Sequence, residues 1–197
     1  MEKSFSLRGI AFSALFAALV VVFGYISIPL GFTPVPITLQ TLAVMLAGGL
    51  LGARYGFFSM LLVVVLTALG LPLLQGKGGI ATLLGPTGGY VVMWPFAALL
   101  IGLVVRKVRS NGWAGTSIVF LAMAGFGSLL LYVTGVPWLA HTVNLTLPKA
   151  LAAGFYPYIP GDMIKAFAAA VITVSLRRAF PQERLTGHGH YGIERNM

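Results

Sequence analysis

Long apolar runs, separated by short stretches rich in proline, glycine or basic residues, dominate the chain. Such runs predict membrane-spanning helices, since about 20 apolar residues cross a bilayer as a helix. We expect six of them, in one all-α integral membrane domain over residues 1–180. The expected helices cover about 7–26, 40–53, 55–69, a run that ends at Arg106, 114–134 and 160–178.

Three irregular stretches interrupt this pattern. Residues 27–38 contain three prolines, which forbid a regular helix and predict an apolar extended loop, either a lid or a packed connector. Residues 75–89 are rich in glycine, which membrane proteins tolerate where the backbone approaches a neighbour or a ligand closely. Residues 139–157 are expected to form a long connection with a short helix, after a break at Gly135–Val136–Pro137 that ends the fifth span.

The basic residues predict the topology. Six spans place both termini on one face, and cytoplasmic loops are enriched in Lys and Arg. Ten of the thirteen Lys and Arg residues fall on the face of the termini, which is therefore predicted to be cytoplasmic; Lys77 and Lys149 lie opposite, and Lys165 lies within the last span. A polar tail, 181–197, is predicted to be mobile. The ten residues are Lys3, Arg8, Arg54, Arg106, Lys107, Arg109, Arg177, Arg178, Arg184 and Arg195.

Composition supports a membrane protein and excludes several other classes. With 58% hydrophobic and 9% charged residues and a mean hydropathy of +0.93, the chain lacks the polar surface to coat a soluble globule. Its net charge of +9 gathers at the ends of apolar runs, as topology signals do, so no nucleic-acid partner is expected. Cysteine is absent and the three histidines are scattered, so neither a metal site nor a cofactor is predicted. The sequence around Gly76 and Lys77 fails the phosphate-loop pattern, because Leu71 and Gly78 stand where a glycine and a Ser or Thr are needed.

The unusual loops converge on the outward face with Asp162, the only acid between Lys3 and Gln182, and with Lys165. Charged residues at membrane depth are a functional hypothesis by default. The two are spaced i,i+3, however, so they could simply neutralise each other near a helix end. Because the pair lacks a nucleophile with an adjacent base, an enzyme is not expected. We expect instead an outward-facing binding cavity with aromatic walls. The aromatic residues could equally belong to an interfacial belt; they are Phe32, Tyr90, Trp94, Trp138, Phe155, Tyr156 and Tyr158.

Three blocks of sequence resemble the BioY family, the biotin-specific substrate-capture (S) components of energy-coupling factor (ECF) transporters. They read VPITLQTL at 35–42, LLGPTGGY at 83–90 and IPGDxxK at 159–165. The likeness runs from about Leu7 to Arg178, in matching order and spacing. It implies a six-helix S-component fold in a prokaryotic cytoplasmic membrane that binds biotin from outside and works with a transmembrane coupling protein and two ATPase subunits. Since some family members are thought to import biotin without these partners, a stand-alone secondary transporter for biotin or another small carboxylated solute stays open.

The resemblance also implies roles for individual residues. Asp162 would accept hydrogen bonds from the ureido N–H groups of biotin, and Lys165 would donate to one end of the ligand, which the motif does not specify. Ala14 and Ala18 match the family's AxxxA motif for docking the coupling protein. Four further ligand-binding candidates lie on the loops and helix ends of the outer face: Gln40, Lys77, Thr87 and Tyr90.

Overall fold

The computed structural model describes residues 6–108, 112–180, 182 and 186–187, which fold almost entirely into helices. The one sheet of these residues is a two-stranded antiparallel pair within the predicted proline loop, where Ser27 faces Thr38 and Ile28 faces Ile37. The elements are α1 (Leu7–Tyr25), β1 (Ser27–Ile28), β2 (Ile37–Thr38), α2 (Gln40–Leu46), the π-helix η1 (Ala47–Leu51), α3 (Gly52–Ala68), α4 (Ile80–Leu84), α5 (Gly88–Val91), α6 (Trp94–Lys107), α7 (Trp113–Ala124), the π-helix η2 (Gly125–Leu129), α8 (Leu130–Thr142), α9 (Leu147–Gly154) and α10 (Ile159–Ala179).

Five uninterrupted helical stretches of the described residues are long and apolar enough to cross a membrane, so the predicted count of six is off by one on this measure. They make the chain a multi-pass membrane protein. The stretches are Leu7–Tyr25, Gln40–Ala68, Gly88–Lys107, Trp113–Thr142 and Ile159–Ala179.

The difference in count arises at Gly52, inside the second stretch. Gly52 has φ 78° and ψ −177°, a conformation that reverses the chain and favours glycine. A Cβ atom on Gly56 would lie 3.0 Å from the Gly48 Cα, although residues eight apart in a straight helix are separated by about 12 Å along its axis. The backbone therefore folds back as a helical hairpin, which agrees with the two helices predicted on either side of Ala53.

The predicted break at Gly135–Val136–Pro137 is wrong, because α8 continues through Pro137 to Thr142. Proline removes one backbone hydrogen bond from a helix. Here the helix gains packing that outweighs this loss, since Val136 and Leu139 are buried in a cluster with α9. The short helix predicted within 139–157 is present as α9, and the last span begins and ends within a residue of its predicted bounds.

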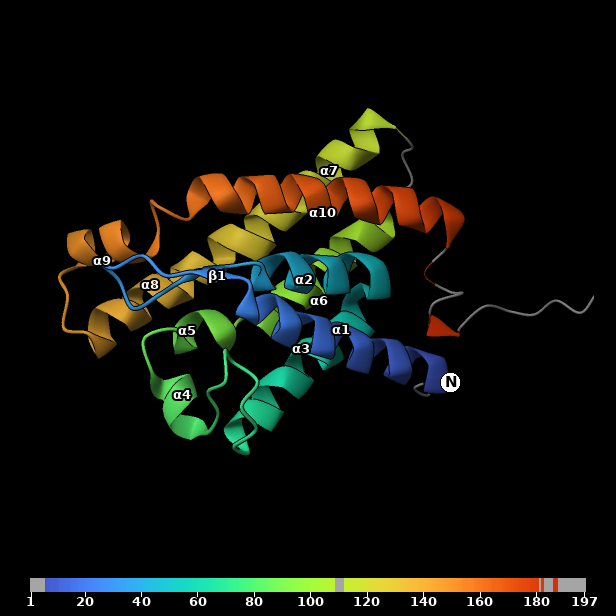
Figure 1. Cartoon of the computed structure of the whole chain (residues 1–197). Coiled ribbons are helices and arrows are strands. Elements are labelled where there is room, and N and C mark those ends of the chain that lie inside the picture. The colour runs from blue at the N-terminus through green and yellow to red at the C-terminus, as the bar shows by residue number, and fades with distance from the viewer. Residues whose placement is uncertain (1–5, 109–111, 181, 183–185, 188–197) are drawn as a thin grey trace, which may run out of the picture.

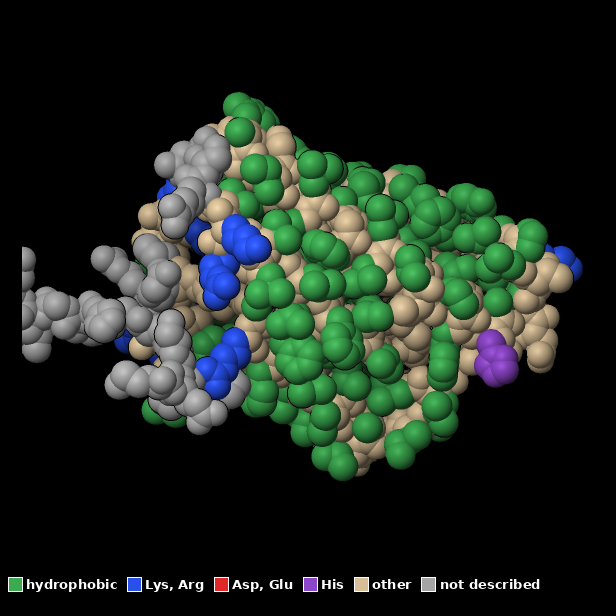
Figure 2. Space-filling view, turned by 180° about the vertical axis from the view of Figure 1, so that it is seen from behind, with side chains coloured by type: hydrophobic (Ala, Val, Ile, Leu, Met, Phe, Trp, Pro, Cys, Tyr) green, Lys and Arg blue, Asp and Glu red, His purple; other side chains and the backbone are tan. Residues whose placement is uncertain are grey.

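The two ends of the membrane domain differ in character. The start of α1 and the end of α10 lie on one side of the molecule, whereas the hairpin of β1 and β2, together with α4, α5 and α9, lies on the other (Figure 1). Figure 2 shows hydrophobic side chains over the middle of one face, with Lys and Arg gathered mainly at one end. This arrangement agrees with the cytoplasmic termini predicted from the charges. Lys3, Arg109, Arg184, Arg195 and most of the predicted tail lie outside the described residues.

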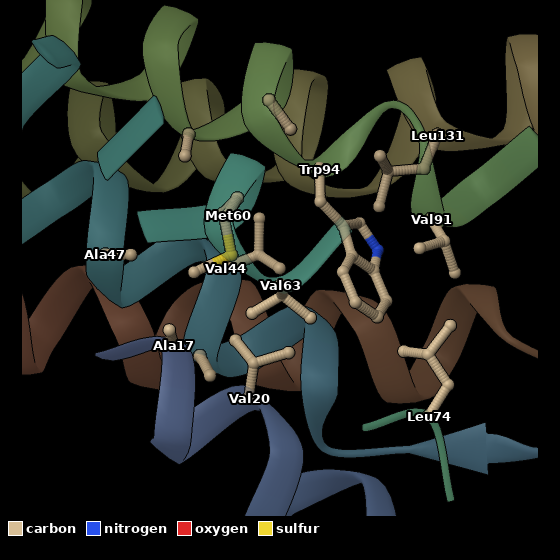
Figure 3. Packing of buried hydrophobic residues seen from close by; sticks show 13 residues of the cluster. Ala17, Val20, Val44, Ala47, Met60, Val63, Leu74, Val91, Trp94 and Leu131 are labelled. Carbon is tan, nitrogen blue, oxygen red and sulfur yellow. The ribbon is translucent and has the colours of Figure 1, made fainter. Parts of the chain in front are cut away.

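A core of buried apolar side chains joins the helices below the outer end (Figure 3). It brings Val20 of α1 and Val63 of α3 together with Trp94 of α6. Trp94 and Leu131 from this core also line the cavity described below, so the packed interior forms part of the cavity wall. A second cluster at the outer end links the β1–β2 hairpin to α8, α9 and the start of α10. Its buried residues are Val35, Tyr132, Val136, Leu139, Ala150, Ala153 and Tyr158.

Candidate ligand-binding site

A cavity of about 530 Å³ lies between the β1–β2 hairpin, the glycine-rich loop, α5 and the first turns of α8 and α10. This size falls within the range of about 300–1,000 Å³ that is usual for small-molecule sites. All six residues predicted to bind ligand line it: Gln40, Lys77, Thr87, Tyr90, Asp162 and Lys165. The structure thus brings together candidates that are spread over 126 positions of the chain.

A charged network occupies the α10 side of the cavity. The Lys165 ammonium lies 2.5 Å from Asp162 Oδ1, and it donates to the Thr38 carbonyl at 2.9 Å and to Thr41 Oγ1 at 2.8 Å. Thr41 in turn donates to Asp162 Oδ1 at 3.4 Å, and the Tyr132 hydroxyl donates to Asp162 Oδ2. Each charge therefore neutralises the other, as the i,i+3 spacing allows.

Burial makes this network more consequential than a surface ion pair. The side chains of Lys165 and Asp162 are only 11% and 7% exposed, so neither charge could stand alone without a large desolvation cost. All three ammonium hydrogens of Lys165 have an acceptor within the protein. A ligand must therefore either replace one of these acceptors or bind Asp162, whose carboxylate keeps about one unused lone-pair site.

Gln40 borders the cavity and carries an unused hydrogen-bond donor, which lies beside Gly24 of α1. The residue is only 6% exposed, and its Oε1 accepts from Thr38 Oγ1 at 3.2 Å. Its Nε2 is buried and has no protein partner. A buried donor without an acceptor costs about 1–3 kcal/mol, so an amide that turned toward an acceptor on a ligand would lose this penalty.

Tyr90 contributes a wall rather than a free hydroxyl. Its O–H donates to the Gly154 carbonyl at 2.9 Å, and a Cβ on Gly135 would collide with its ring. The tyrosine is thereby wedged between α8 and α9, and its ring edge meets Tyr132 at a centroid distance of 6.4 Å.

Lys77 and Thr87 border the opposite side of the cavity. The backbone of Lys77 pairs with Leu74 in a tight turn, which leaves its side chain exposed. Thr87 precedes α5 and is half-buried. Lys77 is thus the one cation of the cavity lining whose charge faces solvent.

The predicted aromatic residues divide into three groups. Tyr90, Trp94 and Tyr158 line the cavity. Trp138 and Phe155 support it from behind, Trp138 by donating to the Gly85 carbonyl at 2.9 Å and Phe155 by packing on the Tyr132 ring. Phe32 and Tyr156 are largely exposed and do not line the cavity.

Sequence reasoning missed Tyr132 and Thr41, the two residues that complete the Asp162 network. Tyr132 lies within the apolar helical stretch Trp113–Thr142, where a hydroxyl needs a partner. That requirement was the available signal, and it could have nominated Tyr132 as a partner of the only acid in the adjacent spans. Thr41 directly follows Gln40 in the first family-like block.

The helix α1 has two faces lined by small residues. Ser13 and Ala17 are buried against α3, where Ser59 donates to the Ser13 carbonyl at 2.7 Å. Ala14 and Ala18 are exposed on the other face. The predicted docking motif, Ala14 and Ala18, is therefore accessible to a partner and is not covered by other parts of the described chain.

The chain matches known proteins over nearly its whole length. A profile of the BioY family matches residues 1–182. The chain belongs to the BioY family. It is 41% identical over 181 residues to the biotin transporter BioY of Rhizobium etli, covering 89% of this chain and 96% of that protein. It is 38% identical to the biotin transporter BioY of Lactococcus lactis, covering 90% and 95%.

A solved structure shares the BioY fold described above. The crystal structure of the S-component for biotin from an ECF-type ABC transporter superposes with a TM-score of 0.80 at 38% sequence identity. The match covers 87% of this chain and 92% of that one. The S-component-like fold expected from the sequence is confirmed.

Proposed function

We propose that this protein captures biotin at the outer face of the membrane, as the substrate-binding component of an ECF transporter. The observation that carries the proposal is the convergence of all six predicted ligand residues on one cavity at the outward end of a BioY-family fold. No covalent step is part of this function.

The chemistry of biotin suits the groups that line the cavity. Its ureido ring has two N–H donors and a carbonyl acceptor, its thioether ring is apolar, and its valerate chain ends in a carboxylate. Of the roughly four lone-pair sites of the Asp162 carboxylate, Lys165, Thr41 and Tyr132 use three, so one remains for a ureido N–H and the long bond from Thr41 would give way to the second. The Gln40 amide, once turned toward the cavity, would donate to the ureido carbonyl. Trp94 and Val91 supply apolar wall for the rings.

The distribution of charge favours one orientation of the ligand. A carboxylate placed beside Asp162 would be repelled by it and would find the Lys165 hydrogens already engaged. The valerate carboxylate therefore points toward Lys77, across the cavity. Lys165 acts by holding and neutralising Asp162, with any direct contact to the ureido group requiring one of its three bonds to break.

The orientation can be tested on Lys77. Because its side chain is exposed, Lys77→Gln is expected to weaken biotin binding only about two- to fivefold, the size of a surface ion pair. Binding of the uncharged biotin amide should not change. Lys149→Gln is the matched control, since Lys149 is an exposed lysine of the outer face that does not line the cavity. Equal losses for the acid and the amide would contradict this orientation.

Equilibrium binding to the purified chain tests the function itself. Biotin should bind saturably and outcompete lipoate and thiamine, which lack its ureido ring, and dethiobiotin, which retains that ureido group, should compete better than either. Absence of saturable biotin binding would refute the proposal. Ion-gradient-driven uptake by the chain alone would instead favour the stand-alone secondary transporter.

The assembly with ECF partners rests on the exposed face of α1. Ala14 and Ala18 offer a lipid-facing strip where another helix can approach closely. Since the chain lacks a phosphate-binding loop of its own, active uptake requires an ATPase partner or an ion gradient.

A further inference from the structure

The cavity has a closed end and an open end. At the closed end, Trp94 and Leu131 are only 4% and 2% exposed. Pro34, Lys77 and Ala81 also line the cavity, yet these three residues are exposed. Pro34 belongs to the β1–β2 hairpin, and the other two belong to the glycine-rich stretch. The cavity therefore opens to solvent between these segments, and we call this opening the mouth.

The groups that would bind the ureido ring lie away from the mouth. Gln40 and Asp162 are 6% and 5% exposed, and Tyr132, which donates to Asp162, is 7% exposed. A ligand whose ureido ring meets Asp162 therefore has its rings in the closed end. Its carboxyl group then points toward Lys77 at the mouth.

Biotin fills only part of this cavity. Its van der Waals volume of roughly 220 Å³ takes up roughly 300 Å³ at the packing density of protein interiors, about 0.75. The cavity measures about 530 Å³. When the rings occupy the closed end, the unfilled space of roughly 200 Å³ lies toward the mouth. A lysine residue packs into roughly 170 Å³ at the same density, so this space suits an amino acid attached to the carboxyl group.

The mouth contributes little to the binding of a free carboxylate. The charge of Lys77 faces solvent, and an exposed ion pair changes affinity only about two- to fivefold. Gln75 and Thr87 also line the cavity, and their neutral polar groups can donate to an amide and accept from it. Replacing the carboxylate by an amide therefore removes one weak ion pair and leaves the amide with hydrogen-bond partners.

We propose that the protein captures a second class of ligand, in which the carboxyl group of biotin is joined as an amide to an amino acid such as lysine. The rings occupy the closed end as those of biotin do, and the amino acid lies in the mouth between Pro34 and Lys77. The inference rests on the proposed function and on its orientation of biotin. Proteolysis of proteins that carry biotin on lysine releases ligands of this class.

Isothermal titration on the full chain in nanodiscs compares biotin with its Nε-lysine amide. We expect the dissociation constant of the amide to lie within about tenfold of that of biotin, because only an exposed ion pair is lost. The Nε-lysine amide of lipoate, which has the same extension without a ureido ring, should not bind.

The outcomes separate this inference from the proposed function. If biotin binds and its lysine amide binds more than about tenfold more weakly, the inference is overturned and the proposed function stands. Equal binding of the lipoate amide would also overturn the inference, since the extension alone would then supply the affinity. Absence of biotin binding would refute the proposed function and this inference with it.

A substitution at the mouth locates the amino acid. Ala81→Trp adds a large side chain there, so it should weaken binding of the lysine amide at least about fivefold more than binding of biotin. Ala152→Trp is the matched control, because Ala152 is an exposed alanine of α9 that does not line the cavity, and it should change the ratio of the two affinities by less than about twofold. Equal losses for the two ligands in Ala81→Trp would overturn the inference.

Discussion

Replacing Asp162 by asparagine separates its two tasks, which are to bind ligand and to neutralise Lys165. Asp162→Asn keeps the size of the side chain and removes its charge. If two ureido N–H groups donate to the carboxylate, and each such charge-assisted bond contributes at least about 1.5 kcal/mol, the loss is at least about 3 kcal/mol. Biotin affinity should therefore fall roughly a hundredfold or more.

The same substitution also leaves Lys165 without a counter-charge at 11% exposure. Breaking a buried ion pair in this way costs about 3–5 kcal/mol, and the remaining bonds to Thr38 and Thr41 offset only part of it. The melting temperature of Asp162→Asn should fall for this reason. Adding Lys165→Gln removes the unpaired charge, so the double variant should regain much of its melting temperature while its affinity stays low.

Isothermal titration with biotin and thermal unfolding of the same preparations give the two readouts. An affinity within threefold of the original in a folded Asp162→Asn protein would remove Asp162 from the binding site. Recovery of affinity in the double variant would show that the carboxylate serves only to neutralise Lys165.

Two further substitutions test the cavity wall and the docking face. Gly135→Ala places a methyl group against the Tyr90 ring, so it should lower the free energy of unfolding by about 1–3 kcal/mol, and with it the melting temperature, and it should also weaken biotin binding. Gly125→Ala, whose added methyl group meets nothing within 4 Å, should change neither property, and equal effects of the two substitutions would refute the close contact between Gly135 and Tyr90. Ala18→Leu should reduce co-purification of the coupling protein without changing biotin binding, and Ala114→Leu, at another exposed alanine, is its control. Assembly that survives Ala18→Leu would contradict docking at this face.

Local sequence predicted the helices better than it predicted their ends. The hydropathy of α1 and α10 placed each within a residue or two, because each is a single apolar run with basic residues nearby. The end of the fifth span was misplaced, since Pro137 breaks isolated helices. In the folded chain, burial of Val136 and Leu139 compensates for the lost bond.

The candidate site shows the same division. Asp162 and Lys165 were predicted from their rarity in an apolar chain, and the family-like blocks supplied Gln40, Thr87 and Tyr90. The hydrogen bond from the Tyr90 hydroxyl to the Gly154 carbonyl could not be predicted, because the two residues are 64 positions apart and meet only when α8 and α9 pack. Within the part of the tail that the structure describes, Gln182 donates to the Leu51 carbonyl at 3.1 Å, another contact between distant residues that the sequence did not predict.

The sequence by itself determined that this protein spans a membrane, which face its basic loops occupy, and that its rare charges lie at the outer end. These properties depend on hydropathy and charge summed over neighbouring residues, which no later folding step alters. Only the tertiary structure decided that Lys165 is saturated by acceptors from Thr38 and Thr41, more than 120 positions earlier, and that Tyr132 completes the carboxylate's bonds. A buried polar group takes whatever partner packing brings within reach, and that choice is made between helices that are distant in sequence.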